Sequence, residues 1–63
     1  PNPLTARERE VLSMIAQGAS DREIAQSLTV SLYTVKAHVR SVLQKLQVAS
    51  RQEAARLARG RAE

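Results

Sequence analysis

Aliphatic residues recur every three or four positions in the segment 31–46, SLYTVKAHVRSVLQKL. At about 100° per residue, this spacing places them on one side of a helix. This inward stripe consists of Leu32, Val35, Val39, Val42, Leu43 and Leu46. The opposite, outward stripe is polar or small and consists of Tyr33, Lys36, Ala37, Arg40 and Gln44. The pattern predicts a helix that packs on a core with one stripe and presents two cations on the other.

Three further segments combine a short apolar stripe with a signal for a helix start. Each opens with Thr or Ser followed three residues later by Glu, the spacing of a capping box. The pairs are Thr5 with Glu8, Ser20 with Glu23, and Ser50 with Glu53. The helices are expected over about 5–17, 21–28 and 51–59, and Ser31 is expected to cap the segment described above. No run alternates with a period of two, so strands are not expected.

The expected inward residues of these three helices are small or aliphatic. They are Val11, Leu12, Ile15 and Ala16 in the first, Ile24, Ala25 and Leu28 in the second, and Ala54, Leu57 and Ala58 in the last, with Ala55 to one side. Gly18 and Gly60 are expected to end the first and last helices, because glycine readily adopts the left-handed conformation found after a helix. The link between the second and third helices is short, which favours the sharp turn of a helix-turn-helix.

A chain of 63 residues has room for only one small domain. The predicted fold is therefore all-α, a compact four-helix domain over residues 5–60 with a helix-turn-helix over 21–40. Residues 1–4 are expected to be the end of a linker and residues 61–63 a tail. Because the sequence starts at Pro1 without Met, it is expected to be part of a longer protein.

Charge is distributed unevenly along the chain, whose formal net charge is +4. The first thirty residues carry three arginines against four acidic residues, whereas residues 31–63 carry seven cations against two. A one-sided basic surface indicates a polyanionic partner, although a solvated Arg-rich tail explains the charge equally well.

Several kinds of chemistry have no support in the composition. There is no Cys, and His38 is the only histidine, so neither a metal site nor a nucleophile with its base is expected. We expect no cofactor and no enzymatic activity. No apolar run is long enough to cross a bilayer and no signal peptide is evident, so a cytoplasmic location away from the membrane is expected.

The outward stripe has the chemistry needed to read DNA. Helix-turn-helix proteins insert their second helix into the major groove, where its amino-terminal half contacts base edges. Lys36 and Arg40 can donate to O6 and N7 of guanine, and Ala37 between them permits close approach and contact with a thymine methyl. Contacts with the DNA backbone are expected from Ser31, Tyr33, Thr34, His38, Lys45 and Arg51. With about five to six phosphates engaged per subunit, the logarithm of the binding constant should fall with log salt with a slope near −5.

The order of these residues resembles a known family. The relevant motifs are Leu4-Thr5-x-Arg7-Glu8, Val11-Leu12, Ile15-Ala16-x-Gly18, Glu23-Ile24-Ala25 and Thr34-Val35-Lys36-x-His38. Together they resemble the LuxR-type (GerE-type) DNA-binding domain of bacterial transcription regulators, which include response regulators, from Leu4 to about Ala58. The chain departs from the family where Asp21 replaces a common Asn and where Gln47 occupies a position often held by Gly. Thr29 also stands at the turn position where many helix-turn-helix proteins have Gly.

The resemblance implies double-stranded DNA as the partner, with bases read by Lys36, Ala37 and Arg40. It also implies pairing into a homodimer through the last helix, where Ala54, Ala55 and Ala58 permit close approach. RNA polymerase is a further candidate partner. Two alternatives stay open, which are a promoter-reading module like that of a sigma factor and a helical interaction or dimerisation domain that binds no DNA.

Overall fold

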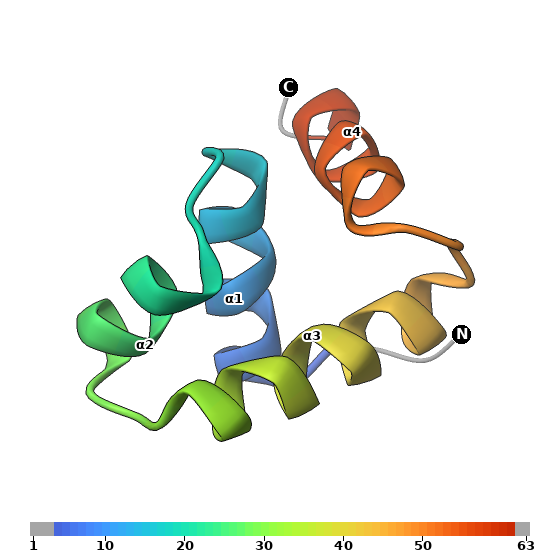
Figure 1. The fold of residues 1–63 in the computed structure, drawn as a ribbon. Helices are drawn as coiled ribbons and strands as arrows, with labels where there is room; N and C mark the ends of the chain where they lie inside the picture. The colour runs from blue at the N-terminus through green and yellow to red at the C-terminus, as the bar shows by residue number, and fades with distance from the viewer. Residues whose placement is uncertain (1–3, 62–63) are drawn as a thin grey trace.

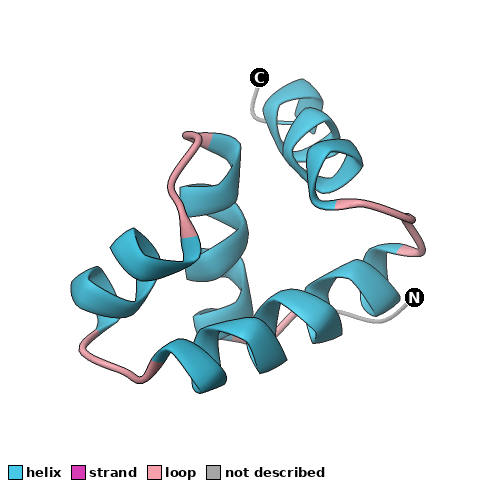
Figure 2. Ribbon diagram, viewed as in Figure 1, coloured by secondary structure: helices cyan, strands magenta, loops and turns pink. Residues whose placement is uncertain are grey.

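The computed structural model describes residues 4–61, which form four helices joined by short loops (Figure 1, Figure 2). They are α1 (Ala6–Ala16), α2 (Asp21–Leu28), α3 (Leu32–Leu46) and α4 (Arg51–Arg61). In Figure 1, α3 runs along the bottom of the view, α1 stands behind and above it, and α2 and α4 lie on opposite sides of α1. Residues 4–61 contain no strand, and the predicted all-α class is confirmed.

The first two helices start where their local sequence predicts. Thr5 Oγ1 accepts a hydrogen bond from the Glu8 N–H at 3.1 Å, and Glu8 Oε1 accepts one from the Thr5 N–H at 2.9 Å. Ser20 and Glu23 repeat this arrangement at 3.1 and 2.8 Å. Because each pair satisfies two backbone donors that the helix leaves free, both starts are determined by residues within one turn.

The last helix differs from its prediction at both ends. Ser50 Oγ accepts from the Glu53 N–H at 3.2 Å as expected, but the Glu53 carboxylate accepts from the N–H of Ala49 rather than that of Ser50. At the other end, α4 continues through Gly60 to Arg61, so the prediction that Gly60 ends the helix is wrong. Gly60 does not have the positive φ of a left-handed terminator, unlike Gly18.

Three residues that follow helices adopt the left-handed conformation. Gly18 has φ of 88°, and Thr29 and Gln47 each have φ of 57°. This conformation costs a residue with a Cβ roughly 1–2 kcal/mol. The turn between α2 and α3 and the link after α3 are therefore made without the glycine that would make them easiest.

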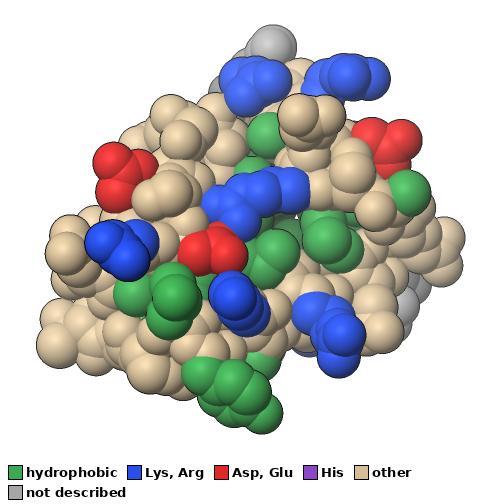
Figure 3. Space-filling view, in the orientation of Figure 1, with side chains coloured by type: hydrophobic (Ala, Val, Ile, Leu, Met, Phe, Trp, Pro, Cys, Tyr) green, Lys and Arg blue, Asp and Glu red, His purple; other side chains and the backbone are tan. Residues whose placement is uncertain are grey.

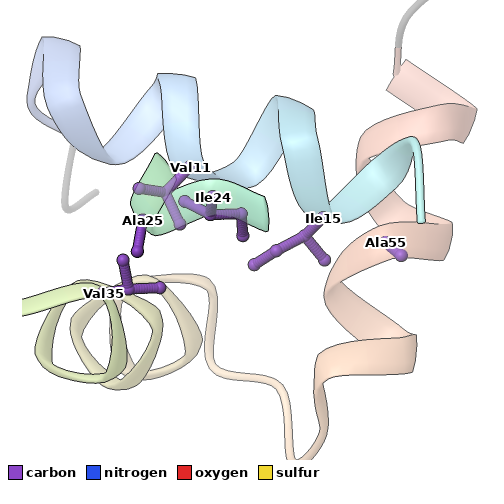
Figure 4. Packing of buried hydrophobic residues seen from close by; sticks show 6 residues of the cluster. All are labelled: Val11, Ile15, Ile24, Ala25, Val35 and Ala55. Atoms are coloured by element: carbon purple, nitrogen blue, oxygen red, sulfur yellow. The ribbon is translucent and has the colours of Figure 1, made fainter. Parts of the chain in front are cut away.

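The core draws on all four helices. Its central cluster contains Val11, Ile15, Ile24, Ala25, Val35 and Ala55 (Figure 4). Figure 4 shows Val35 of α3 close to Ala25 of α2, and Ile15 of α1 lying between Ile24 of α2 and Ala55 of α4. Since the apolar stripe of α3 is used in this packing, its opposite stripe remains on the surface.

Three predictions about inward residues are corrected. Ala55, expected to one side, is in the core, whereas Leu57 is 36% exposed. On α4 the inward face is centred between Ala54 and Ala55. At 100° per residue, Leu57 lies about 110° around the helix axis from that centre and therefore points away from the core. Leu32, expected in the core stripe, is 42% exposed. It precedes Val35, the first α3 residue of the central cluster, by almost one turn and so lies at the rim.

Candidate nucleic-acid interface

The outward stripe of α3 lies on the surface, as predicted. Lys36, Ala37, Arg40 and Gln44 are all exposed, and Tyr33 retains 82% of its accessible surface. Within residues 4–61, neither the Lys36 ammonium nor the Arg40 guanidinium takes part in an ion pair. Two cations one helical turn apart are thus available to an outside partner.

An open groove of about 390 Å³ runs beside this stripe. Its walls come from the first turn of α2, the flank of α3 and the link between α3 and α4, and its lining residues are Asp21, Lys36, Val39, Arg40, Leu43, Gln44, Val48 and Ala49. Figure 3 shows one face of the molecule, on which apolar side chains lie among Lys and Arg side chains with some carboxylates between them. The groove therefore combines apolar side chains with charges of both signs.

Lys45, an expected contact with the DNA backbone, has an internal partner. Its Nζ lies 2.8 Å from Oε1 of Glu8, and Ser41 Oγ donates to Oε2 of the same carboxylate at 2.5 Å. Glu8 is only 5% exposed. The hydrogen bonds from Lys45, Ser41 and the Thr5 backbone lower the pKa of Glu8 from 4.5 to about 2, against the opposing effect of burial. Glu8 therefore both caps α1 and joins α1 to α3.

Arg51, the other expected backbone cation of this region, is also engaged within the chain. One guanidinium nitrogen forms an ion pair with Asp21, and the other donates to the Ala19 carbonyl at 2.7 Å. Its planar fork thus bridges the start of α4 to the α1–α2 loop and the first residue of α2. Sequence reasoning missed these partners, because Glu8 had been assigned only to a cap and Asp21 to no contact.

The remaining predicted backbone contacts gather at the start and along one flank of α3. Ser31 Oγ accepts from the Thr34 N–H at 3.1 Å and lies 2.9 Å from Thr34 Oγ1. Thr34 and His38 are half-buried, whereas Ser31 and Tyr33 are exposed. Ser31 therefore serves first as the helix cap, whereas the exposed Tyr33 has no capping role.

The alanines expected at a dimer contact are not equally accessible. Ala54 is fully buried and Ala55 is 8% exposed within the single chain. Ala58 is half-buried. Further along α4, Arg59 Nη1 donates to the Ala16 carbonyl at 2.9 Å, so this face of the helix is directed at α1.

Arg22 is a candidate that sequence reasoning overlooked. It is exposed in the first turn of α2, next to Asp21, which lines the groove. Its acidic neighbours are already engaged, since Asp21 pairs with Arg51 and Glu23 accepts from the Ser20 N–H. The sequence signal was its position: Arg22 lies between the capping residues Ser20 and Glu23 but has no part in the cap itself.

Residues 4–61 hold no cluster of three or more His, Cys, Asp or Glu side chains placed to bind a metal ion. In the same range, none of the helices has the length and apolar character needed to span a bilayer.

Residues 2–58 match the sequence pattern described as bacterial regulatory proteins, luxR family. The chain belongs to the luxR family. Within the matched range, α2, the turn at Thr29 and α3 follow one another as helix, turn and helix. The resemblance drawn from the motifs is thereby confirmed, together with the four-helix fold that it implies.

Individual luxR-family relatives are similar over most of this chain. It is 48% identical over 54 residues to the nitrate/nitrite response regulator protein NarL of Escherichia coli (strain K12). It is 47% identical over 53 residues both to the monoamine regulon transcriptional regulator of Klebsiella aerogenes and to the transcriptional regulatory protein DesR of Bacillus subtilis. These matches cover 84–86% of this chain but only 23–27% of each relative. The chain spans about a quarter of their length, and the names of these relatives are those of regulatory proteins.

Proposed function

We propose that this domain binds double-stranded DNA in a sequence-specific manner as the effector part of a bacterial transcription regulator. The observation that carries the proposal is the separation of α3 into two faces. Val35 and Val42 are fully buried, while Lys36, Ala37 and Arg40 are exposed on the other side. A helix held by one face and cationic on the other is suited to the major groove.

The spacing of the two cations suits base reading. Lys36 and Arg40 are four residues apart, which corresponds to about 6 Å along a helix. Stacked base pairs are about 3.4 Å apart, so the two side chains are suited to bases about two steps apart. Each can donate to a guanine, and the small Ala37 allows the helix backbone to approach the base edges.

Contacts with phosphates are assigned to groups that have no acidic partner within the described residues. Tyr33 and Arg22 are exposed, and Ser31, Thr34 and His38 contribute along the start and flank of α3. Lys45 and Arg51 are weaker candidates, because each already neutralises a carboxylate. These contacts would position the domain on the duplex, and the outward stripe would supply the sequence preference.

Pairing through α4 is the second part of the proposal. A homodimer would place two α3 helices on paired half-sites, as symmetric helix-turn-helix proteins do. Ala54 and Ala55 are covered within one chain, so Ala58 and the exposed Leu57 are the apolar groups that this helix offers a second copy. RNA polymerase is a further candidate partner, and DNA binding would take place in the bacterial cytoplasm.

Chemical-shift mapping with duplex DNA tests the proposal. The amide signals of Lys36, Ala37 and Arg40 are expected to move on addition of a mixed-sequence duplex. Those of the exposed Ser13 on α1 and Gln17 directly after it are expected to stay in place. Shifts confined to other surfaces would contradict the assigned face. A complete absence of binding would instead favour a helical interaction domain, and tight binding to RNA polymerase without DNA would favour a sigma-like module.

A further inference from the structure

We propose that Arg51 acts in DNA binding by neutralising Asp21, and not by contacting a phosphate itself. Arg51 is thus a positioning residue, and its effect on affinity passes through one carboxylate. The inference rests on the proposed function and assigns a new role to a pair that the helix-turn-helix shares with α4.

Asp21 lies where a carboxylate is unfavourable for a DNA-binding surface. It lines the same groove as Lys36 and Arg40, and its side chain is 27% exposed. A phosphate approaching those cations would also approach Asp21, and like charges repel over several ångströms in partly exposed surroundings. The carboxylate is therefore tolerable at this surface only if its charge is compensated.

Arg51 supplies that compensation from another element. One of its guanidinium nitrogens pairs with Asp21 and the other is fixed on the Ala19 carbonyl at 2.7 Å. With the guanidinium anchored at two points, reaching a phosphate would break both contacts. A planar, doubly anchored arginine is better suited to holding a carboxylate than to following a mobile backbone.

Loss of Arg51 would affect the groove in a second way. An uncompensated Asp21 would be free to attract Lys36 or Arg40, which line the same groove and have no ion-pair partner within residues 4–61. Either pairing would withdraw a base-reading cation from DNA. Both effects, the repulsion and the withdrawal, disappear when Asp21 is made neutral.

A double-mutant cycle separates this role from direct contact. Binding of a fluorescent mixed-sequence duplex is measured by anisotropy for the unaltered chain, Arg51→Gln, Asp21→Asn and the double variant. We expect Arg51→Gln to weaken binding roughly tenfold, and Asp21→Asn to bind as well as the unaltered chain or better. In the Asp21→Asn background, Arg51→Gln should change affinity by less than about threefold.

The proposal would be overturned if Arg51→Gln weakened DNA binding equally with Asp21 present and with Asp21→Asn. An equal loss is expected if Arg51 contacts a phosphate or acts through its bond to Ala19, because both contacts are lost whether or not Asp21 is charged. Arg51→Lys, which keeps the charge without the fork, should retain affinity within about threefold and keeps the test valid if Arg51→Gln unfolds. If Arg51→Lys loses as much DNA affinity as Arg51→Gln, the planar geometry of the guanidinium matters and its charge alone does not explain the effect. Thermal midpoints identify variants that lose binding by unfolding.

The exposed pair Arg7 and Glu10, with its 3.4 Å separation on α1, provides the matched control. Arg7→Gln and Glu10→Gln change net charge in the same way at residues that do not line the groove. A double-mutant cycle of these two substitutions should show no coupling in DNA affinity. Coupling as large as that between Asp21 and Arg51 would mean that the effect does not depend on the position of the pair in the groove. If the unaltered chain binds no duplex, the proposed function itself fails, whereas binding with uncoupled losses rejects only the role of Arg51.

Discussion

Lys45 Nζ lies 2.8 Å from Oε1 of Glu8, although 37 positions separate the two residues in the sequence. The contact joins the first turn of α1 to the last turn of α3, and Ser41 completes it at the second carboxylate oxygen. α3 is thus fixed to the domain by a polar contact as well as by its aliphatic stripe.

Stability should fall in acid because of Glu8. Its pKa is lowered from 4.5 to about 2 in the folded chain, so its contribution is fully present above about pH 4.5 and is lost as pH falls toward 2. Since Lys45 remains partly exposed and its charge is screened, we expect this contribution to be about 1–2 kcal/mol. Chemical unfolding at a series of pH values measures it. In Glu8→Gln the acid-dependent part should be absent, and an unchanged pH profile would contradict the assignment.

Two lysines of α3 should respond differently to removal. Lys36→Ala should weaken binding to a preferred duplex by roughly 1–3 kcal/mol and relax sequence preference, with little change in stability. Lys45→Ala should lower stability by about 1–2 kcal/mol, because it leaves Glu8 without its cation. Titrations with preferred and unrelated duplexes, together with thermal unfolding, separate the two effects. An equal loss on every duplex would make Lys36 a phosphate contact.

The salt dependence of binding should be shallower than composition alone suggests. Lys45 and Arg51 already neutralise carboxylates, so about three to four phosphates remain to be engaged per subunit instead of five to six. The logarithm of the binding constant should therefore fall with log salt with a slope of about −3 rather than −5. Anisotropy titrations over a range of potassium chloride concentrations give this slope. A value near −5 would mean that both internal pairs open on DNA.

The same substitution should have opposite effects at the two glycines. A Cβ at either Gly18 or Gly60 would meet no atom within 4 Å, so only the backbone conformation matters. Gly18 has φ of 88°, and Gly18→Ala should cost about 1–2 kcal/mol of stability. Gly60 is helical, and Gly60→Ala should stabilise by up to about 1 kcal/mol. Thermal unfolding of the two variants side by side provides the measurement. A change of the melting temperature in the same direction for both variants would refute the prediction.

Enlarging the alanines of α4 should separate folding from self-association. Ala54 is fully buried, and Ala54→Leu should destabilise the single chain by about 1–3 kcal/mol through overpacking. Ala58 is half-buried, and Ala58→Leu should leave folding nearly unchanged while altering self-association on DNA. Sedimentation with and without duplex DNA detects the second effect. Unchanged assembly in Ala58→Leu would place the contact between copies elsewhere.

The helix starts could be predicted because the deciding groups are neighbours in sequence. Thr5 with Glu8 and Ser20 with Glu23 satisfy each other's backbone groups within one turn. The two faces of α3 could likewise be predicted from periodicity. Its left-handed ending at Gln47 was harder, because a residue other than glycine adopts that conformation only when the packing around it requires it.

The partners of Lys45 and Arg51 could not be predicted from the sequence. Their carboxylates lie 37 and 30 positions away, and only the packing of α1, α2, α3 and α4 brings them together. The inward face of α4 was predicted only in part: Ala54 was expected there and is buried, but Ala55 was not, since an alanine fits a core, a surface or an interface. Periodicity therefore selected Leu57 as inward, whereas α4 packs through Ala54 and Ala55.

The two stripes of α3 have no residue in common, and this independence matters for how such a domain changes over time. Exchanging an outward side chain removes no atom from the interior, so the fold tolerates drift at those positions with little thermodynamic penalty. Duplicated copies of one ancestral gene can then diverge in what they recognise while inheriting the same scaffold. A protein engineer can exploit the same freedom by randomising the outward positions and selecting for new targets.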